Sequence, residues 1–195
     1  MTSDATTAQS GQAQQRNDSV TMITTVENWF STEECERVIA FGGFTQEKQG
    51  TVGAERAVSN ARSSQIRFIP PGEQSAWIYQ KIESTLAHMN KAYRYHLTGI
   101  ELIQVARYDV GCYYNWHMDL GPNNNSLRKL SLSVQLSNAE DYEGGDLEFM
   151  NSTPPYHRGR GTLIVFPSFL THRVTAVTSG ARLSLVAWVT GNPFS

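Results

Sequence analysis

The spacing of apolar residues predicts helices in the first half of the chain. Over residues 73–95, apolar side chains recur every three or four positions, which indicates one long helix. A shorter helix is predicted to begin after Ser31, because Ser31 and Glu34 have the spacing of a capping box, and to end at the glycine pair that starts with Gly42. The apolar residues of the long helix are Trp77, Ile78, Ile82, Leu86, Met89 and Tyr93.

After Gly99 the pattern changes to short β-prone runs separated by clusters of Gly, Pro, Asn and Asp. Eight such runs suit a double-sheet jelly-roll barrel. The predicted fold class is therefore α+β, a double-stranded β-helix (jelly-roll) core with the N-terminal helices packed on one sheet. Two further short strands are expected at residues 22–29 and 65–69. The eight runs are residues 100–108, 113–118, 128–137, 146–150, 156–158, 162–166, 172–177 and 182–189.

Residues 130–136 alternate strictly between apolar and polar side chains, which is the period of a strand. The apolar face is expected to pack in a core. The polar face is compatible with two positions, since it can line a ligand pocket inside a barrel or face solvent. The apolar residues are Leu130, Leu132, Val134 and Leu136, and the polar ones are Ser131, Ser133 and Gln135.

Two segments are expected to lie outside the regular core. Residues 1–19 are rich in polar residues and in alanine, so they are predicted to form a disordered tail, which leaves residues 20–195 as one domain. Residues 45–64 are polar and show no sustained period, so they are predicted to form a long mobile loop. Because such loops often act as lids, this one is expected to close over a substrate pocket.

Composition narrows the functional classes. Sixteen basic and eighteen acidic side chains give a net charge of −2, so neither nucleic acid nor a membrane surface is the expected partner. No apolar stretch approaches the roughly 18 residues that a membrane span needs. Cys35 and Cys112 lack the spacing of a disulfide scaffold or a Cys-x-x-Cys zinc site, which fits a reducing, cytoplasmic location.

Three residues have the pattern of metal ligands. His117 and Asp119 are two apart on a predicted strand, so their side chains leave the same face, and His172 begins a later strand. Two imidazoles and one carboxylate on one face of an ion are the donor set of non-haem Fe(II) oxygenases, which keep open positions for other ligands. A zinc hydrolase can use the same donors, so the triad indicates a metal more firmly than a reaction.

Arg182 is the candidate anion anchor. It lies ten residues after His172 and shares a strand face with Ser184. If the two strands form a hairpin about residues 179 and 180, His172 and Arg182 are roughly 16 Å apart along the strands, a gap that a guanidinium and a five-carbon diacid can bridge. The planar guanidinium suits a carboxylate because it binds bidentately and stays charged.

Five segments together resemble the prolyl 4-hydroxylase branch of the Fe(II)- and 2-oxoglutarate-dependent oxygenases. Their order and spacing make the resemblance far more specific than any single segment, and it covers roughly residues 22–190. The segments are residues 104–108 (QVARY), 114–119 (YNWHMD), 142–147 (YEGGDL), 166–168 (FPS) with 172–175 (HRVT), and 180–184 (GARLS).

The resemblance implies roles for the candidate ligands. By this likeness, His117, Asp119 and His172 bind Fe(II), and Arg182 pairs with the distal carboxylate of 2-oxoglutarate. Many animal collagen hydroxylases have Lys at the position of Arg182, whereas oxygen-sensing and bacterial relatives have Arg, so the departure points to the smaller members of the family.

The same resemblance extends to the co-substrate and the reaction. It implies that Tyr108 hydrogen-bonds 2-oxoglutarate and that Ser184 and Gln135 belong to the co-substrate pocket. The implied activity is that of a procollagen-proline 4-dioxygenase-like enzyme, which uses Fe(II), 2-oxoglutarate and O₂ to hydroxylate an unactivated C–H. Ascorbate is a candidate additional cofactor. The expected substrate is a prolyl residue of a protein or peptide, and the expected assembly is a monomer or small homo-oligomer.

Two other functions stay open on the sequence. Within the same superfamily, the substrate can be a free amino acid or another small molecule. From another class, the chain can be a non-catalytic, metal-containing jelly-roll binding protein, although the presence of all three ligands together with Arg182 argues against loss of turnover. An alkylated-base repair enzyme is disfavoured because Trp188 stands where its second Arg is expected.

Overall fold

The computed structural model describes residues 23–44, 55–58, 61–150 and 157–194. Within them the chain forms two α-helices, α1 (Thr32–Phe41) and α2 (Ala76–Tyr93), and two 3-10 turns, η1 (Asn123–Leu127) and η2 (Ala139–Asp141). The strands are β1 (Thr24–Val26), β2 (Glu55–Val58), β3 (Arg62–Ile69), β4 (Leu97–Ile100), β5 (Ile103–Asp109), β6 (Tyr113–His117), β7 (Arg128–Gln135), β8 (Tyr142–Gly144), β9 (Leu147–Phe149), β10 (Leu163–Pro167), β11 (His172–Val174) and β12 (Val177–Gly191).

Both helices occur where the sequence predicts them. The backbone N–H of Glu34 donates to Oγ of Ser31 at 3.2 Å, and the backbone N–H of Ser31 donates to the Glu34 carboxylate at 2.8 Å, so the predicted capping box of α1 is confirmed. The long helix is confirmed as α2, with the apolar positions Ile78, Ile82 and Leu86 buried. Neither helix combines the length and the apolar character that a membrane crossing requires, as far as the described residues go.

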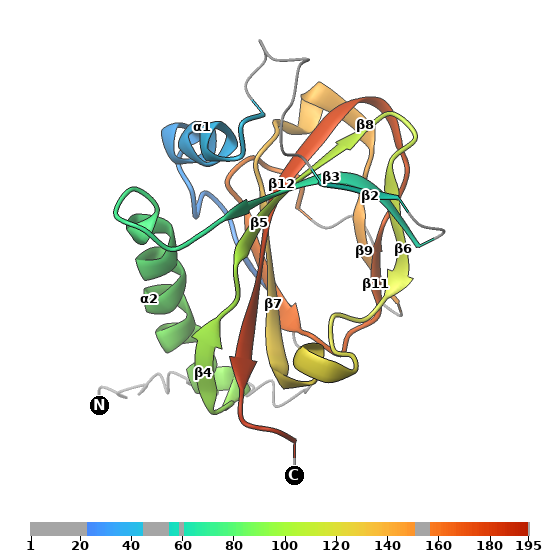
Figure 1. The fold of residues 1–195 in the computed structure, drawn as a ribbon. Coiled ribbons are helices and arrows are strands. Elements are labelled where there is room, and N and C mark those ends of the chain that lie inside the picture. Colours follow the sequence, from blue (N-terminus) through green and yellow to red (C-terminus); the bar gives the residue numbers. More distant parts are fainter. Residues whose placement is uncertain (1–22, 45–54, 59–60, 151–156, 195) are drawn as a thin grey trace, which may run out of the picture.

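The strands form one antiparallel sheet that curls round on itself, as Figure 1 shows. Its hydrogen-bonded order is β1-β10-β7-β12-β5-β3-β6-β11-β9, with β2, β4 and β8 pairing at its margins. Because β3 joins both β5 and β6, the long strands β5, β7 and β12 lie opposite the short strands β6, β9 and β11. This curled sheet with two helices is consistent with the predicted jelly roll.

Two hydrophobic clusters lie on the two faces of this sheet. One contains buried residues of α1 and α2 together with residues of β5, β7, β10 and β12. The other contains alternate residues of β5 and β10, such as Tyr108 and Phe166, with residues of β9 and β11. Since successive residues of a strand face opposite ways, the same strands supply both clusters. The second cluster lies inside the curl, where the site described below is found.

The alternation of residues 130–136 is resolved in favour of an inward polar face. Every residue of β7 after Arg128 is buried, including Ser131, Ser133 and Gln135. The apolar residues of β7 belong to the cluster that includes the helices, so the polar residues face the inside of the curl. The solvent-facing alternative is therefore wrong.

The turn predicted at residues 178–180 is wrong. β12 runs without a break from Val177 to Gly191, and β11 pairs with β6 and β9 instead of β12. Gly180 has a φ of +69°, and a Cβ there would clash with the backbone oxygen of Asp141. Glycine at position 180 therefore allows the backbone of β12 to approach the backbone of Asp141 closely. In the sequence, a glycine required for such a close approach looks the same as a glycine required for a turn.

The structure also revises the segments outside the predicted core. The predicted tail, residues 1–19, and residues 45–54 of the predicted loop lie outside the described residues. The predicted loop is wrong at residues 55–58 and 62–64, because β2 pairs with β3, which begins at Arg62. Backbone pairing at a sheet margin needs no apolar period, so the sequence shows no strand signal there. The strand predicted at residues 156–158 is also wrong at residues 157 and 158, which lie outside any strand.

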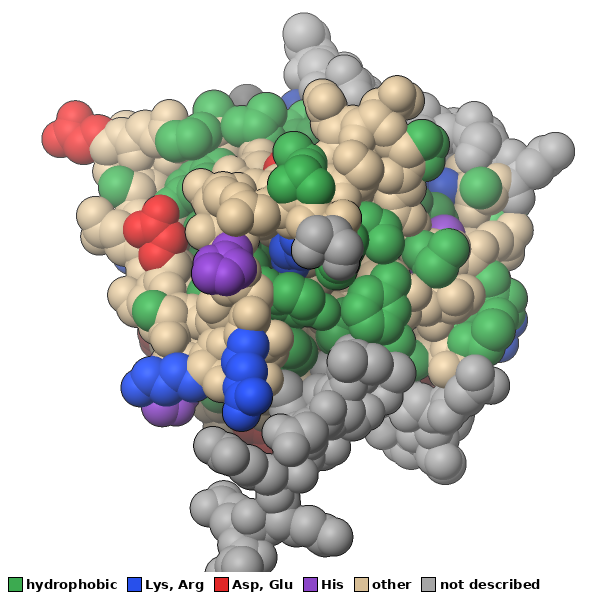
Figure 2. All heavy atoms as spheres, turned by 90° about the horizontal axis from the view of Figure 1, so that it is seen from below, with side chains coloured by type: hydrophobic (Ala, Val, Ile, Leu, Met, Phe, Trp, Pro, Cys, Tyr) green, Lys and Arg blue, Asp and Glu red, His purple; other side chains and the backbone are tan. Residues whose placement is uncertain are grey.

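Figure 2 shows the end of the molecule where η1, β4 and the end of β12 lie. Hydrophobic side chains gather at the middle of this face, and exposed Leu127 belongs to η1, one of the elements at this end.

Candidate metal centre

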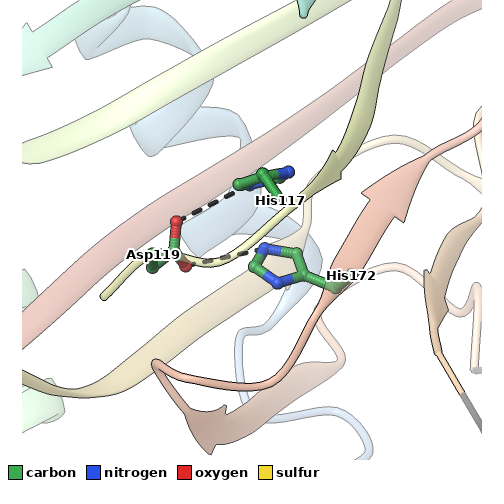
Figure 3. Close-up of side chains that lie close together, drawn as sticks. All are labelled: His117, Asp119 and His172. Carbon is green, nitrogen blue, oxygen red and sulfur yellow. Dashed lines mark ion pairs between the residues drawn. The ribbon is translucent and has the colours of Figure 1, made fainter. Parts of the chain in front are cut away.

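The three predicted metal ligands meet inside the curled sheet. His117 ends β6, His172 begins β11, and the two are direct cross-strand partners. Asp119 follows two residues after His117, and one donor atom from each residue lies within 4.8 Å of the others. Figure 3 shows the three side chains converging from two adjacent strands and the segment after β6. The structure thus brings together residues that are 55 positions apart in the sequence (172 minus 117).

Each imidazole is oriented by a backbone carbonyl. Nδ1 of His117 lies 2.7 Å from the carbonyl oxygen of Asn115, and Nδ1 of His172 lies 2.9 Å from that of Leu170. A carbonyl only accepts, so in both rings Nδ1 carries the proton and Nε2 presents a lone pair. The two Nε2 atoms lie 3.7 Å and 3.5 Å from the two oxygens of Asp119. This is the arrangement that a cation between them requires.

Burial keeps His117 neutral. It lowers the pKa of His117 to about 4, and the neighbouring His172 adds to the effect. The ring of Tyr114 stacks on that of His117 with centroids 3.5 Å apart, and the guanidinium of Arg62 lies 4.7 Å above Tyr114. Only a neutral imidazole binds a metal, so the surroundings hold this ligand in the competent form at neutral pH.

A small, partly open cavity lies beside the triad. All three triad residues line it, and so does Arg182 on β12. The remaining walls come mainly from the inward residues of β5, β7, β11 and β12.

Arg182 is a buried cation with few partners. It is 1% exposed, and its one recorded hydrogen bond is a long one, from Nη1 to Oγ of Ser184 at 3.4 Å. Its Nε has no hydrogen-bond partner, and no carboxylate forms an ion pair with it within the described ranges. A buried guanidinium is costly unless an anion pairs with it. The residues present therefore fit a carboxylate ligand together with a metal.

Part of the sequence matches a known family. Residues 103–190, which include the triad and Arg182, match the family model described as the 2OG-Fe(II) oxygenase superfamily. The chain therefore resembles this superfamily over 88 of its 195 residues, those that contain the candidate site. The His-Asp-His cluster within this segment has the donor types that a non-haem Fe(II) site uses.

The curated relatives that match this chain include PKHD-type hydroxylases. A PKHD-type hydroxylase of Idiomarina loihiensis is 36% identical over 89 residues, which are 45% of this chain and 41% of the relative. A PKHD-type hydroxylase of Crocosphaera subtropica is 28% identical over 178 residues, covering 86% of this chain and 78% of that protein. The chain thus spans less than half the length of the first of these relatives.

Solved oxygenase structures share the fold. A prolyl-4-hydroxylase of Pseudomonas putida matches with a TM-score of 0.71 at 20% identity, covering 87% of this chain and 92% of the other. A prolyl hydroxylase of Trichoplax adhaerens, in complex with a hypoxia inducible factor oxygen degradation domain peptide fragment, matches with a TM-score of 0.70 at 19% identity and covers 87% and 83%. At such identities these likenesses show the fold.

The co-substrate residues expected of the oxygenase divide into two groups. Tyr108 and Ser184 line the cavity, and the ring of Tyr108 lies 5.6 Å from the guanidinium carbon of Arg182. Gln135 does not line the cavity, although it is buried and is the cross-strand partner of Ser184. The structure thus brings Tyr108, Ser184 and Arg182 together at the cavity, whereas Gln135 is not among the residues that line it.

Sequence reasoning missed other residues of the cavity. Gln104 lines it with a buried Oε1 that has no hydrogen-bond partner, and Arg62 lines it too. Gln104 lies four residues before Tyr108 on β5, so strand alternation gave a usable signal for it. Arg62 comes from the segment predicted to be a loop, which left no such signal.

Proposed function

We propose that the chain is an Fe(II)- and 2-oxoglutarate-dependent dioxygenase that hydroxylates an unactivated C–H. The observation that carries the proposal is the buried guanidinium of Arg182, which lacks a carboxylate partner among the described residues and opens on the same cavity as the His-Asp-His cluster. A structural metal site alone gives no reason for an unpaired cation beside it. A co-substrate that carries two carboxylates does.

The roles of the residues follow from their positions. His117, Asp119 and His172 would hold Fe(II), and the cavity that they line would receive the co-substrate and O₂. Arg182 binds the distal carboxylate of 2-oxoglutarate, and Tyr108 borders the same space. Fe(II) with 2-oxoglutarate and O₂ supplies the oxidising power for C–H hydroxylation.

The apolar walls of the cavity support the same role. Leu147, Phe166 and Val174 belong to the inner hydrophobic cluster and also line the cavity. Such walls limit the access of water to the reacting groups, which strengthens the pairing between Arg182 and a bound carboxylate. The protein's own contribution is thus to bind, orient and shield.

We propose that the substrate is a prolyl residue of a protein or peptide. The jelly-roll core, with the helices against one wall, would hold it. Support comes from relatives named PKHD-type hydroxylases and from the likeness to prolyl hydroxylases, one of them in complex with a peptide. The likeness to those structures is one of fold, so the assignment depends on analogy. Free amino acids are the competing substrates in the test below.

The test is conversion of 2-oxoglutarate to succinate by the purified protein with Fe(II) and O₂, with and without ascorbate. Proline-containing peptides are compared with a panel of free amino acids, and mass spectrometry detects the added oxygen atom. The proposal expects succinate and product to form together with wild-type protein and to be lost in Arg182→Ala. Arg107→Ala is the matched control, because Arg107 lies on the neighbouring strand β5, pairs with Asp109 and lines no part of this cavity.

The outcomes separate the candidate functions. Product from peptides alone supports the prolyl assignment, whereas product from free amino acids alone replaces it with a small-molecule hydroxylase. Binding of Mn(II) and 2-oxoglutarate without succinate under any condition would mean a non-catalytic binding protein.

A further inference from the structure

Two buried serines lie directly beneath the carboxylate of Asp119. Oγ of Ser131, on β7, donates to Oδ2 of Asp119 at 2.6 Å, and Oγ of Ser168, just after β10, lies 3.0 Å from Oγ of Ser131. Ser131 and Ser168 are fully buried, and Asp119 is 6% exposed. The two hydroxyls thus form a buried chain that ends on the carboxylate of Asp119.

The direction of the hydrogen bonds follows from proton counting. An ionised carboxylate only accepts, so the single hydroxyl proton of Ser131 is used on Asp119. In the contact between the serines, Ser131 must therefore accept and Ser168 must donate. Both protons point toward Asp119, and hydrogen bonds aligned in this way polarise one another. Charge assistance makes the bond to the carboxylate the stronger of the two.

Ser168 also ties the backbone around the site. Its N–H donates to the carbonyl of Lys129 at 3.0 Å, and its own carbonyl accepts from the N–H of Leu120 at 2.9 Å. Leu120 directly follows Asp119, which lies beyond the end of β6 and so has no place in the ladder between β6 and β11. The segment that carries Asp119 is therefore held by β7 and Ser168.

The two oxygens of Asp119 are treated differently. Oδ2 accepts the proton of Ser131, whereas no hydrogen bond reaches Oδ1 from the described part of the chain. A carboxylate on a single torsion rotates freely unless a partner fixes it, and rotation would move its oxygens away from the two Nε2 atoms. One fixed oxygen therefore sets the orientation of both.

We propose that Ser131 and Ser168 form a positioning pair for the carboxylate ligand, in which Ser168 orients Ser131 and Ser131 fixes the plane of Asp119. The inference rests on the metal site of the proposed function. Neither serine touches the ion. Outer partners of metal ligands typically contribute about 10- to 100-fold to metal affinity.

The test is Mn(II) affinity, measured by isothermal titration calorimetry, in Ser131→Ala, Ser168→Ala and the double variant. Ser131→Ala is expected to weaken Mn(II) binding about 10- to 100-fold, and Ser168→Ala to weaken it less. The double variant should bind like Ser131→Ala, because Ser168 acts only through Ser131. The d–d absorption of bound Co(II), which responds to ligand geometry, should change in the same order.

Ser137→Ala is the matched control. Ser137 is also buried and lies two residues after the end of β7, and its hydroxyl donates to the carbonyl of Ala181 and accepts from the N–H of Leu183, far from the triad in the register of β7. It should lose stability without a change in Mn(II) affinity or the Co(II) spectrum. Ser131→Thr, which keeps the hydroxyl, should restore affinity.

Wild-type Mn(II) affinity in folded Ser131→Ala would overturn the proposal. If Ser131→Ala does not fold, Ser168→Ala decides, and wild-type affinity there would overturn it equally. The proposed function fails separately, because a wild-type protein that binds Mn(II) but forms no succinate leaves the positioning pair intact.

Discussion

Arg182 is expected to lower the stability of the ligand-free protein while it binds 2-oxoglutarate, and one substitution tests both effects. Its guanidinium is buried, has an unpartnered Nε, and has only a 3.4 Å hydrogen bond to Ser184. Replacement by Met, which is also long and flexible, removes the buried charge while filling most of the space. Removal of buried charge in favour of apolar packing stabilises proteins by up to about 1–4 kcal/mol.

The expected size of the effect follows from the chain length. A change of 1 kcal/mol shifts the Tm of a protein of this size by about 2–4 °C. Arg182→Met should therefore raise the Tm of the metal-free, ligand-free protein by about 2–16 °C. Its ring partner Tyr108 contributes about 0.5–2 kcal/mol of cation–π attraction in the native protein, which places the result in the lower part of that range.

Ligand binding should respond in the opposite sense. At 2-oxoglutarate one hundred times its Kd, binding adds about 2.7 kcal/mol to the wild-type protein, or about 5–11 °C in Tm. Arg182→Met should keep the shift caused by Mn(II) and lose the further shift caused by 2-oxoglutarate. Differential scanning fluorimetry measures both shifts on the same samples.

Arg107→Met is the control for a surface arginine. Arg107 is one-third exposed and pairs with Asp109 at 2.8 Å. Its replacement should therefore change the free energy of unfolding by less than about 1 kcal/mol and leave the Tm shift caused by 2-oxoglutarate intact. A destabilised Arg182→Met that still responds to 2-oxoglutarate like the wild type would refute the reasoning, since it would show that the arginine is structural.

Four further expectations follow from the same structure. His172→Ala should abolish calorimetric Mn(II) binding while circular dichroism shows an intact fold; retained affinity would exclude it as a ligand. Gly180→Ala should lower urea stability more than Gly111→Ala, because both have positive φ but only the former would clash with backbone; equal losses would contradict this. Ser31→Ala should cost about 0.5–2 kcal/mol in urea unfolding through loss of the α1 cap, and an unchanged midpoint would show that the cap is dispensable. Without metal, His117 has a folded pKa of about 4 against about 6.5 unfolded, so its contribution is present above pH 6.5 and is lost as the pH falls toward 4; His117→Asn should flatten that part of the stability profile.

Local patterns made the helices predictable. The capping box of Ser31 and Glu34 and the spacing of apolar residues in α2 depend on neighbours within the same helix, so the sequence carried the information directly. Glycine was misleading at Gly180, because close backbone approach inside a strand and a turn require the same residue. β2 left no pattern, since its pairing with β3 uses backbone groups that every residue has.

The candidate site was predictable only in part, for a similar reason. His117 and Asp119 share a strand face by their spacing, but only the resemblance implied that they meet His172, and that meeting depends on the pairing of β6 with β11. The supposed hairpin between His172 and Arg182 was wrong although both reach the site, because the curl of the sheet brings their strands to one cavity. Ser168 had no signal, since its role depends on Ser131, on a distant strand.

β7 is the strand on which a small error in alignment would be most damaging. Its leucines pack with the helices while its serines face the metal cavity, so a slip of one residue against β10 and β12 would exchange the two sets. Hydroxyls would then be buried among hydrocarbon and leucines would fill the cavity. The energetic penalty of that exchange disfavours the shifted alignment. A chain whose β7 leucines pack correctly against the helices therefore also has Ser131 facing Asp119.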